Sequence, residues 1–81
     1  MKEIIRFTAS WCQPCKGLAM NLESAELEFP ITVVDIDINP EIAIEYQVRS
    51  VPTMVLKENG LVKSKLIGLH APAKIKEWAD E

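Results

Sequence analysis

The chain has 81 residues, of which 48% are hydrophobic and 26% charged, and its formal net charge is −3. This size and composition are typical of an ordinary globular protein, so we expect residues 1–81 to form a single domain. The basic residues are scattered along the chain, which argues against a nucleic acid as partner. No segment approaches the roughly 20 apolar residues of a membrane-spanning helix, and no signal segment follows Met1, so we expect a cytoplasmic protein without membrane contact.

The first strand and the first helix are predicted from residues 3–8 and 14–28. Residues 3–8 favour a β-strand, and the largely apolar run at residues 4–7 is typical of a strand that is buried on both faces. Apolar side chains then recur at helical spacing over residues 14–28, and Pro30 ends the helix because the residue before a proline avoids the helical conformation. Gly17 lies inside this helix at a cost of about 1 kcal/mol relative to alanine, for which close packing would be a reason.

A second strand and a short helix follow. Residues 31–36 are rich in β-branched side chains and predict the strand. Asn39 and Pro40 form a typical helix start, because Asn39 can cap the first turn and Pro40 fits the first helical position. We expect this helix to continue to about Tyr46.

The last part of the chain is predicted to be a hairpin followed by a helix. Strands are expected at residues 53–56 and 61–67, joined by a turn at residues 58–60 whose Asn-Gly pair is typical of a hairpin. Gly68 ends the fourth strand, and Ala71-Pro72 opens the final helix. The order β-α-β-α-β-β-α predicts an α/β fold in which a four-stranded mixed sheet carries helices on both faces.

The only two cysteines, Cys12 and Cys15, lie where the first strand leads into the first helix. The free N–H groups and the dipole of the helix N-terminus favour an anion, so we expect the thiolate of Cys12 to be stabilised and its pKa to fall. Cys15 is expected on the buried side of the helix, close enough to form a disulfide with the more exposed Cys12. Such a small ring constrains the unfolded chain little, so we interpret the pair as a redox switch rather than a structural bridge.

A metal site is the other alternative for these cysteines. Zinc needs four ligands, and His70 and the carboxylates lie at no ligand spacing, so a zinc or iron–sulfur site would have to be shared between two chains. We therefore expect no metal and no cofactor in the chain. His70 is interpreted as an exposed loop residue rather than a proton-transfer group.

Four stretches of the chain resemble the thioredoxin family, in the order and spacing of that family. They are residues 7–16 (FTASWCQPCK), 37–40 (DINP), 46–53 (YQVRSVPT), and Asn59-Gly60 followed by Gly68. The resemblance implies a minimal thioredoxin fold and a thiol–disulfide oxidoreductase that reduces protein disulfides. It also implies that the Val51–Pro52 peptide is cis and lies against the cysteines.

The resemblance further implies a substrate groove and a set of partners. The groove residues would be Trp11, Gln13, Pro14, Val51, Pro52, Gly68 and Leu69. Trp11 lies at a turn beside the first cysteine and is expected to form a groove wall rather than part of the core, whereas Trp78 is expected in the core. The implied partners are disulfide-bearing proteins and a recycling enzyme similar to thioredoxin reductase, and the chain is expected to be a monomer.

Two other functions stay open. One is a glutaredoxin-like, glutathione-linked protein or an electron donor to ribonucleotide reductase. The acidic stretch by which glutaredoxins hold glutathione is absent, because residues 68–71 read Gly-Leu-His-Ala, which favours a donor similar to thioredoxin. The second is a binding module that keeps the fold without catalysis.

The chain departs from the family at several positions. The family's N-terminal strand and helix have no counterpart, so residues 31–36 are expected at a sheet edge, where charges discourage strand association. Arg6 replaces the family's buried acid, and Val33 replaces a nearby lysine. An Arg inside the fold needs a partner, and we favour an ion pair with Asp35 or Asp37. The alternative is that Arg6 stabilises the thiolate of Cys15.

Overall fold

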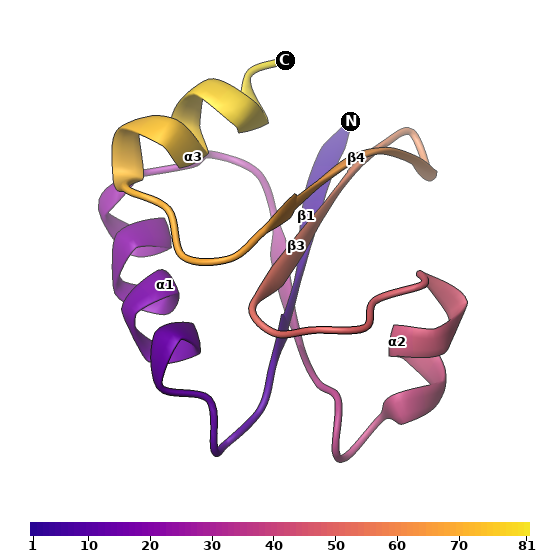
Figure 1. Ribbon diagram of the computed structural model, residues 1–81. Coiled ribbons are helices and arrows are strands. Elements are labelled where there is room, and N and C mark those ends of the chain that lie inside the picture. The colour runs from indigo at the N-terminus through magenta and orange to yellow at the C-terminus, as the bar shows by residue number, and fades with distance from the viewer.

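A four-stranded sheet organises the chain, and the computed structural model describes all residues from 1 to 81. The elements follow the predicted order β-α-β-α-β-β-α (Figure 1). Their bounds are β1 Lys2–Thr8, α1 Gln13–Ser24, β2 Ile31–Asp35, α2 Pro40–Glu45, β3 Thr53–Glu58, β4 Leu61–Ile67 and α3 Pro72–Ala79. None of these helices has the length and the apolar character needed to cross a membrane.

The sheet is mixed, with the strand order β2-β1-β3-β4. β1 pairs in parallel with β2 and antiparallel with β3, and β3 pairs antiparallel with β4. The β3–β4 hairpin turns at Asn59 and Gly60, whose φ angles of 55° and 83° are those that a tight hairpin turn requires. β2 is an edge strand, as predicted, and β1 is an inner strand that pairs with a neighbouring strand on each side.

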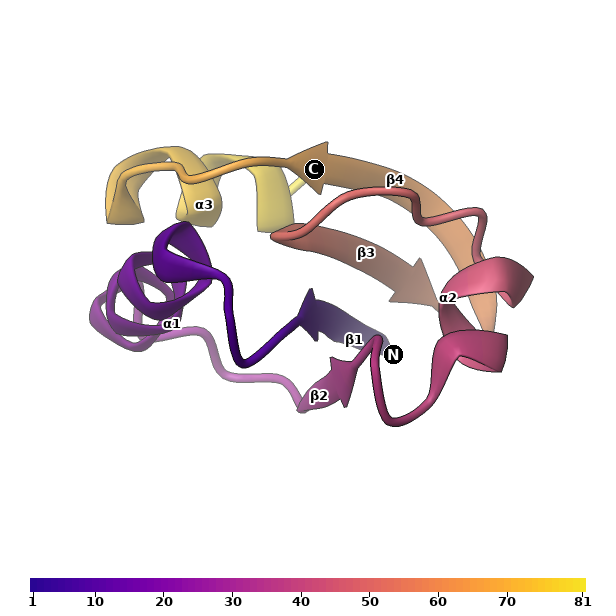
Figure 2. The same ribbon diagram turned by 60° about the horizontal axis from the view of Figure 1, so that its bottom comes forward.

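Helices cover both faces of the sheet (Figure 2). Successive side chains of β1 point to opposite faces, so Ile4 and Ile5 belong to two different cores. The core between the sheet and helices α1 and α3 contains Ile4, Leu18, Leu22, Ala25, Met54, Leu56, Ile75, Trp78 and Ala79. The core on the α2 side contains Ile5, Phe7, Val34, Ala43 and Val55.

Trp78 lies in the first of these cores, as predicted. Its side chain is 4% exposed. The indole Nε1–H still has a partner, because it donates a 2.8 Å hydrogen bond to Oγ of Ser64 on β4. A buried indole that keeps such a bond contributes its full apolar area to packing without leaving a polar group unsatisfied.

The first helix is shorter than predicted. α1 ends at Ser24, four residues before the expected end at Glu28. Glu26 adopts a φ of 52°, which turns the chain out of the helical path. Leu27 and Phe29 then pack against the core between α1, α3 and the sheet. Burial of these two side chains outweighs continuation of the helix, a tertiary effect that spacing cannot reveal.

Other boundaries shift by smaller amounts. β2 ends at Asp35 rather than at residue 36, and β3 continues two residues beyond its expected end, to Glu58. The short helix begins after Asn39 as predicted, but the Asn39 side chain makes no capping hydrogen bond. β4 and the start of α3 have the predicted positions.

The two chain ends lie beside each other. Nζ of Lys2 donates hydrogen bonds of 2.8 Å to the carbonyl oxygen of Ala79 and of 2.9 Å to that of Glu81. Both ends lie far from the connection between β1 and α1, at the opposite end of the molecule (Figure 1).

Substitution of the helical Gly17 by alanine is expected to stabilise the fold. A methyl group there would lie 3.5 Å from Cδ1 of Leu69, an ordinary contact distance, so the close packing leaves room for it. Gly17→Ala should raise the free energy of unfolding by about 1 kcal/mol, measured by urea denaturation. Gly60→Ala is the matched control and should lower it by about 1–2 kcal/mol, because Gly60 has a φ of 83°. A destabilised Gly17→Ala variant would contradict the expectation.

The candidate redox site

The two cysteines are positioned by the turn that joins β1 to α1. The N–H of Cys12 donates a 3.1 Å hydrogen bond to the carbonyl of Ala9, which closes the turn. Cys12 is the N-cap residue of α1, with extended backbone angles, and its Sγ accepts a 3.2 Å hydrogen bond from the N–H of Cys15. Pro14 occupies the first turn and has no N–H, so the N–H of Cys15 is the donor left in reach of the capping atom.

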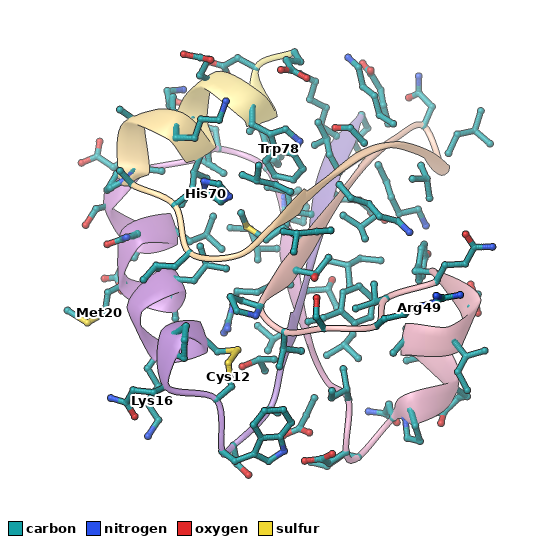
Figure 3. All side chains as sticks on the ribbon, viewed as in Figure 1. Cys12, Lys16, Met20, Arg49, His70 and Trp78 are labelled. Atoms are coloured by element: carbon teal, nitrogen blue, oxygen red, sulfur yellow. A yellow bond between two sulfur atoms is a disulfide. The ribbon has the colours of Figure 1, made fainter.

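Cys12 and Cys15 form a disulfide (Figure 3). Their Cα atoms are 5.3 Å apart. Both residues are nearly buried, Cys12 at 3% and Cys15 at 1% exposure, so Cys12 is the more exposed cysteine only by a small margin in the oxidised protein. Ala9, which is also buried, completes this small cluster.

The predicted groove residues that adjoin the cysteines in the sequence are largely exposed. Trp11 is 67% exposed, and Gln13 and Pro14 are also exposed. The structure therefore excludes a core role for Trp11, the alternative to a groove wall.

The predicted groove residues from later in the chain come close to the same turn. Val51 packs against the cysteine cluster, and the buried Pro52 follows it through a cis peptide bond, as predicted. The N–H of Gly68 donates a 2.9 Å hydrogen bond to the carbonyl of Pro52. Leu69 is 51% exposed and lies over Gly17 of α1. The fold thus gathers these residues around one end of α1.

Asp37 is a residue of this region whose contact was not predicted. Its Oδ2 accepts a 2.8 Å hydrogen bond from Nε1 of Trp11, which fixes one edge of the exposed indole. The N–H of Asp37 donates in turn to Oδ1 of Asp35, at 2.8 Å. In the sequence, the only feature that pointed to a role of Asp37 in the site was its position in the DINP stretch of the family resemblance.

Arg6 makes no ion pair, so the predicted pairing with Asp35 or Asp37 is wrong. In the parallel register Arg6 lies opposite Val33, which offers no charge. Partial burial lowers the pKa of the Arg6 guanidinium from its ordinary value, because burial disfavours the charged form. Arg6 lines a cavity of about 240 Å³ together with Cys15 and Asp35.

His70 is held away from the sulfurs by its own contacts. Its Nε2 lies 2.8 Å from the carbonyl oxygen of Ile67, and its own carbonyl accepts a 2.9 Å hydrogen bond from Nδ2 of Asn21. Figure 3 shows His70 beside the later turns of α1. No three His, Cys, Asp or Glu side chains are grouped so that they could hold a metal ion.

The whole chain, residues 1–81, matches the family model described as Thioredoxin. The chain belongs to the thioredoxin family. It is 40% identical over 79 residues to a thioredoxin of Rickettsia bellii, covering 93% of this chain and 75% of the relative. It also resembles the solved structure of an N21Q mutant thioredoxin from Halobacterium salinarum, with a TM-score of 0.91 and 30% identity over 98% of this chain and 72% of that one.

A further relative joins two activities in one chain. It is the bifunctional thioredoxin reductase/thioredoxin of Mycobacterium leprae, 40% identical over 76 residues that cover 89% of this chain and 17% of that protein.

Family membership and the cysteine geometry together establish the activity. The protein is a thiol–disulfide oxidoreductase whose Cys12–Cys15 pair forms the disulfide. Closing this disulfide releases two electrons to a partner, and reducing it takes two electrons up.

Loss of the Trp11–Asp37 hydrogen bond is expected to free the exposed indole. Such a bond contributes about 1 kcal/mol, so hydrogen exchange of the Trp11 indole N–H should be about fivefold faster in Asp37→Ala. Nuclear magnetic resonance resolves this signal from that of the Trp78 indole, which is bound to Ser64 and should not change. Asp37→Asn keeps an oxygen acceptor and should behave like the unaltered protein. Equal exchange rates in Asp37→Ala would show that the bond does not hold the ring.

Proposed function

We propose that this protein reduces disulfide bonds in other proteins, with Cys12 as the attacking thiol and Cys15 as the resolving thiol. The thiolate of Cys12 attacks a substrate disulfide, forms a mixed disulfide and releases one substrate sulfur as a thiolate that takes up a proton. Cys15 then attacks Cys12, which releases the second substrate sulfur and leaves the Cys12–Cys15 disulfide. This cycle requires no cofactor in the chain.

The capping position of Cys12 carries this assignment of roles. The hydrogen bond from the Cys15 N–H ends on Cys12 Sγ at the start of α1, where a negative charge is favoured. Cys15 lies one turn further along the helix, among its buried residues, whereas Cys12 stands at the helix end, so we expect a bulky protein disulfide to reach Cys12 first.

The proposed substrate site is the groove around this end of α1. Trp11, Gln13 and Pro14 would form one wall, and Gly68 and Leu69 the other. Between them, neither the N–H nor the carbonyl of Val51 has a hydrogen-bond partner within the chain. An extended substrate segment could pair with this free backbone, as in other cases of strand addition, with Pro52 fixing its position.

Recycling by an enzyme similar to thioredoxin reductase is part of the proposal. The Mycobacterium leprae relative, whose name joins thioredoxin reductase with thioredoxin, supports this partner. A reducing compartment such as the cytoplasm would suit a dithiol that must be returned to its reduced form. We propose that residues 1–81 act there as one domain and as a monomer.

Replacement of each cysteine by serine is expected to separate the two roles. Cys12→Ser should abolish insulin reduction. Cys15→Ser should also lose turnover but retain the first attack, and should therefore accumulate a covalent mixed disulfide with insulin, detectable by mass spectrometry. Capture by Cys12→Ser in place of Cys15→Ser would reverse the assignment.

Recycling can be tested with the purified oxidised protein. The Cys12–Cys15 disulfide should be reduced faster by NADPH and a bacterial thioredoxin reductase than by NADPH, glutathione reductase and glutathione. The consumption of NADPH measures the rate in both mixtures. Omission of the protein gives the control rate for each mixture. Faster recycling by glutathione would favour the glutaredoxin-like alternative.

A further inference from the structure

The cavity of about 240 Å³ behind Cys15 contains an unusual set of charges. Arg6 from β1, Lys16 from α1 and Asp35 from β2 all line it, together with the Cys15 side chain. Cys15 is 1% exposed, so a thiolate formed there has little hydration from bulk water. A buried thiolate needs a neighbouring positive charge, because burial alone raises the pKa of a thiol.

We propose that Arg6 is a positioning residue whose charge stabilises the Cys15 thiolate in the resolving step. This inference rests on the proposed role of Cys15 as the resolving thiol. Arg6 is suited to the task because it forms no ion pair with a carboxylate within the chain. The guanidinium remains charged at all relevant pH values, since arginine is not deprotonated in proteins.

The other charged groups around Cys15 act less strongly or in the opposite direction. Lys16 is exposed and its side chain points outward from α1 in Figure 3, so water and salt screen its charge. Asp35 lines the cavity from β2, and its carboxylate disfavours a nearby thiolate. The other residues that line the cavity, Thr8, Ala9, Ser10 and Ala19, are uncharged, as are Ile36 and Val51, the partly buried apolar residues packed against the cysteine cluster.

All bonds and protons of the resolving step are accounted for without Arg6 acting as a base. The Cys15 thiol gives its proton to water, and the thiolate attacks Sγ of Cys12. The Cys12–Cys15 bond forms while the bond from Cys12 to the substrate breaks. The substrate sulfur leaves with the electron pair and takes up a proton from water. Arg6 contributes charge and neither gives nor accepts a proton.

The first test measures the titration of Cys15 directly. In a Cys12→Ser background Cys15 is the only thiol, and its carbon-13 Cβ shift reports ionisation by nuclear magnetic resonance. Adding Arg6→Gln should raise the pKa of Cys15 by about 1, whereas Arg6→Lys should restore most of the original value. An unchanged pKa in Arg6→Gln would overturn the proposal, and so would failure of Arg6→Lys to restore it.

Asp35→Asn is an independent variant that should shift the pKa of Cys15 in the direction opposite to Arg6→Gln. Asp35 lies on the edge strand, and asparagine keeps the Oδ1 acceptor that the N–H of Asp37 uses. If charge in the cavity controls Cys15, this variant should lower the pKa of Cys15. An unchanged pKa or a rise would show that charge in the cavity does not act on Cys15 and would overturn the proposal, even if Arg6→Gln fails to fold.

The kinetic test separates this inference from the proposed roles. Dithionitrobenzoate reacts with a dithiol in two steps, and each releases thionitrobenzoate, which is followed by absorbance in a stopped-flow instrument. In Arg6→Gln the first release should keep its rate, while the second should be about tenfold slower at pH values below the pKa of Cys15. Equal slowing of both releases would indicate a structural role and overturn the proposal. Capture of insulin by Cys15→Ser tests the roles themselves and does not depend on Arg6.

Discussion

The hydrogen bond from the Cys15 N–H to Cys12 Sγ is the contact that the rest of the structure supports. It exists because α1 begins directly at Cys12 and because Pro14 removes the competing donor of the first turn. α1 can begin at Cys12 only if the preceding strand, β1, is held so that it ends close to this position. β1 is an inner strand, and its hydrogen-bonded pairing with β2 and with β3 fixes its position. A sulfur on a loop without this helix start would lack the donor that stabilises its anion.

Two side chains connect the sulfurs to the body of the protein. Ile36, just after β2, and Val51, before β3, pack both against the cysteine cluster and against the core on the α2 side. The site is therefore continuous with one of the two cores although it lies at the surface. The N–H of Gly68 adds a further connection by bonding to the carbonyl of Pro52. Rigid placement of this kind keeps reacting groups in a productive arrangement through a two-step exchange.

Local patterns predicted much of this architecture. β4 was predicted with correct bounds because its limits are set by local signals, the Asn-Gly turn and Gly68. The end of α1 was not predictable in this way, because it depends on where Leu27 and Phe29 find the core. The order of the elements followed from the alternation of strand and helix patterns, whereas the edge position of β2 followed from the family resemblance, because the family's N-terminal strand has no counterpart here.

Contacts between distant residues limited the prediction of the site. Trp11 and Asp37 are 26 residues apart, and only the fold brings the indole to the carboxylate. The predicted ion pair of Arg6 was wrong because opposite charges in a sequence do not show how far apart the side chains lie in the fold. No acidic side chain comes within ion-pair distance of Arg6. The burial of Cys12 was also underestimated, since Ile36 and Val51, which pack against the cysteine cluster, come from distant parts of the chain that only the fold brings together.

The contact of Lys2 with the carbonyls of Ala79 and Glu81 has a consequence for the architecture of larger proteins. Both ends of the chain lie at the pole of the molecule opposite the disulfide (Figures 1 and 3). A partner domain attached to either end by a flexible tether would start on the far side and leave the sulfurs uncovered. A short linker between the two ends would likewise permit circular permutation, with new ends opened in a surface turn.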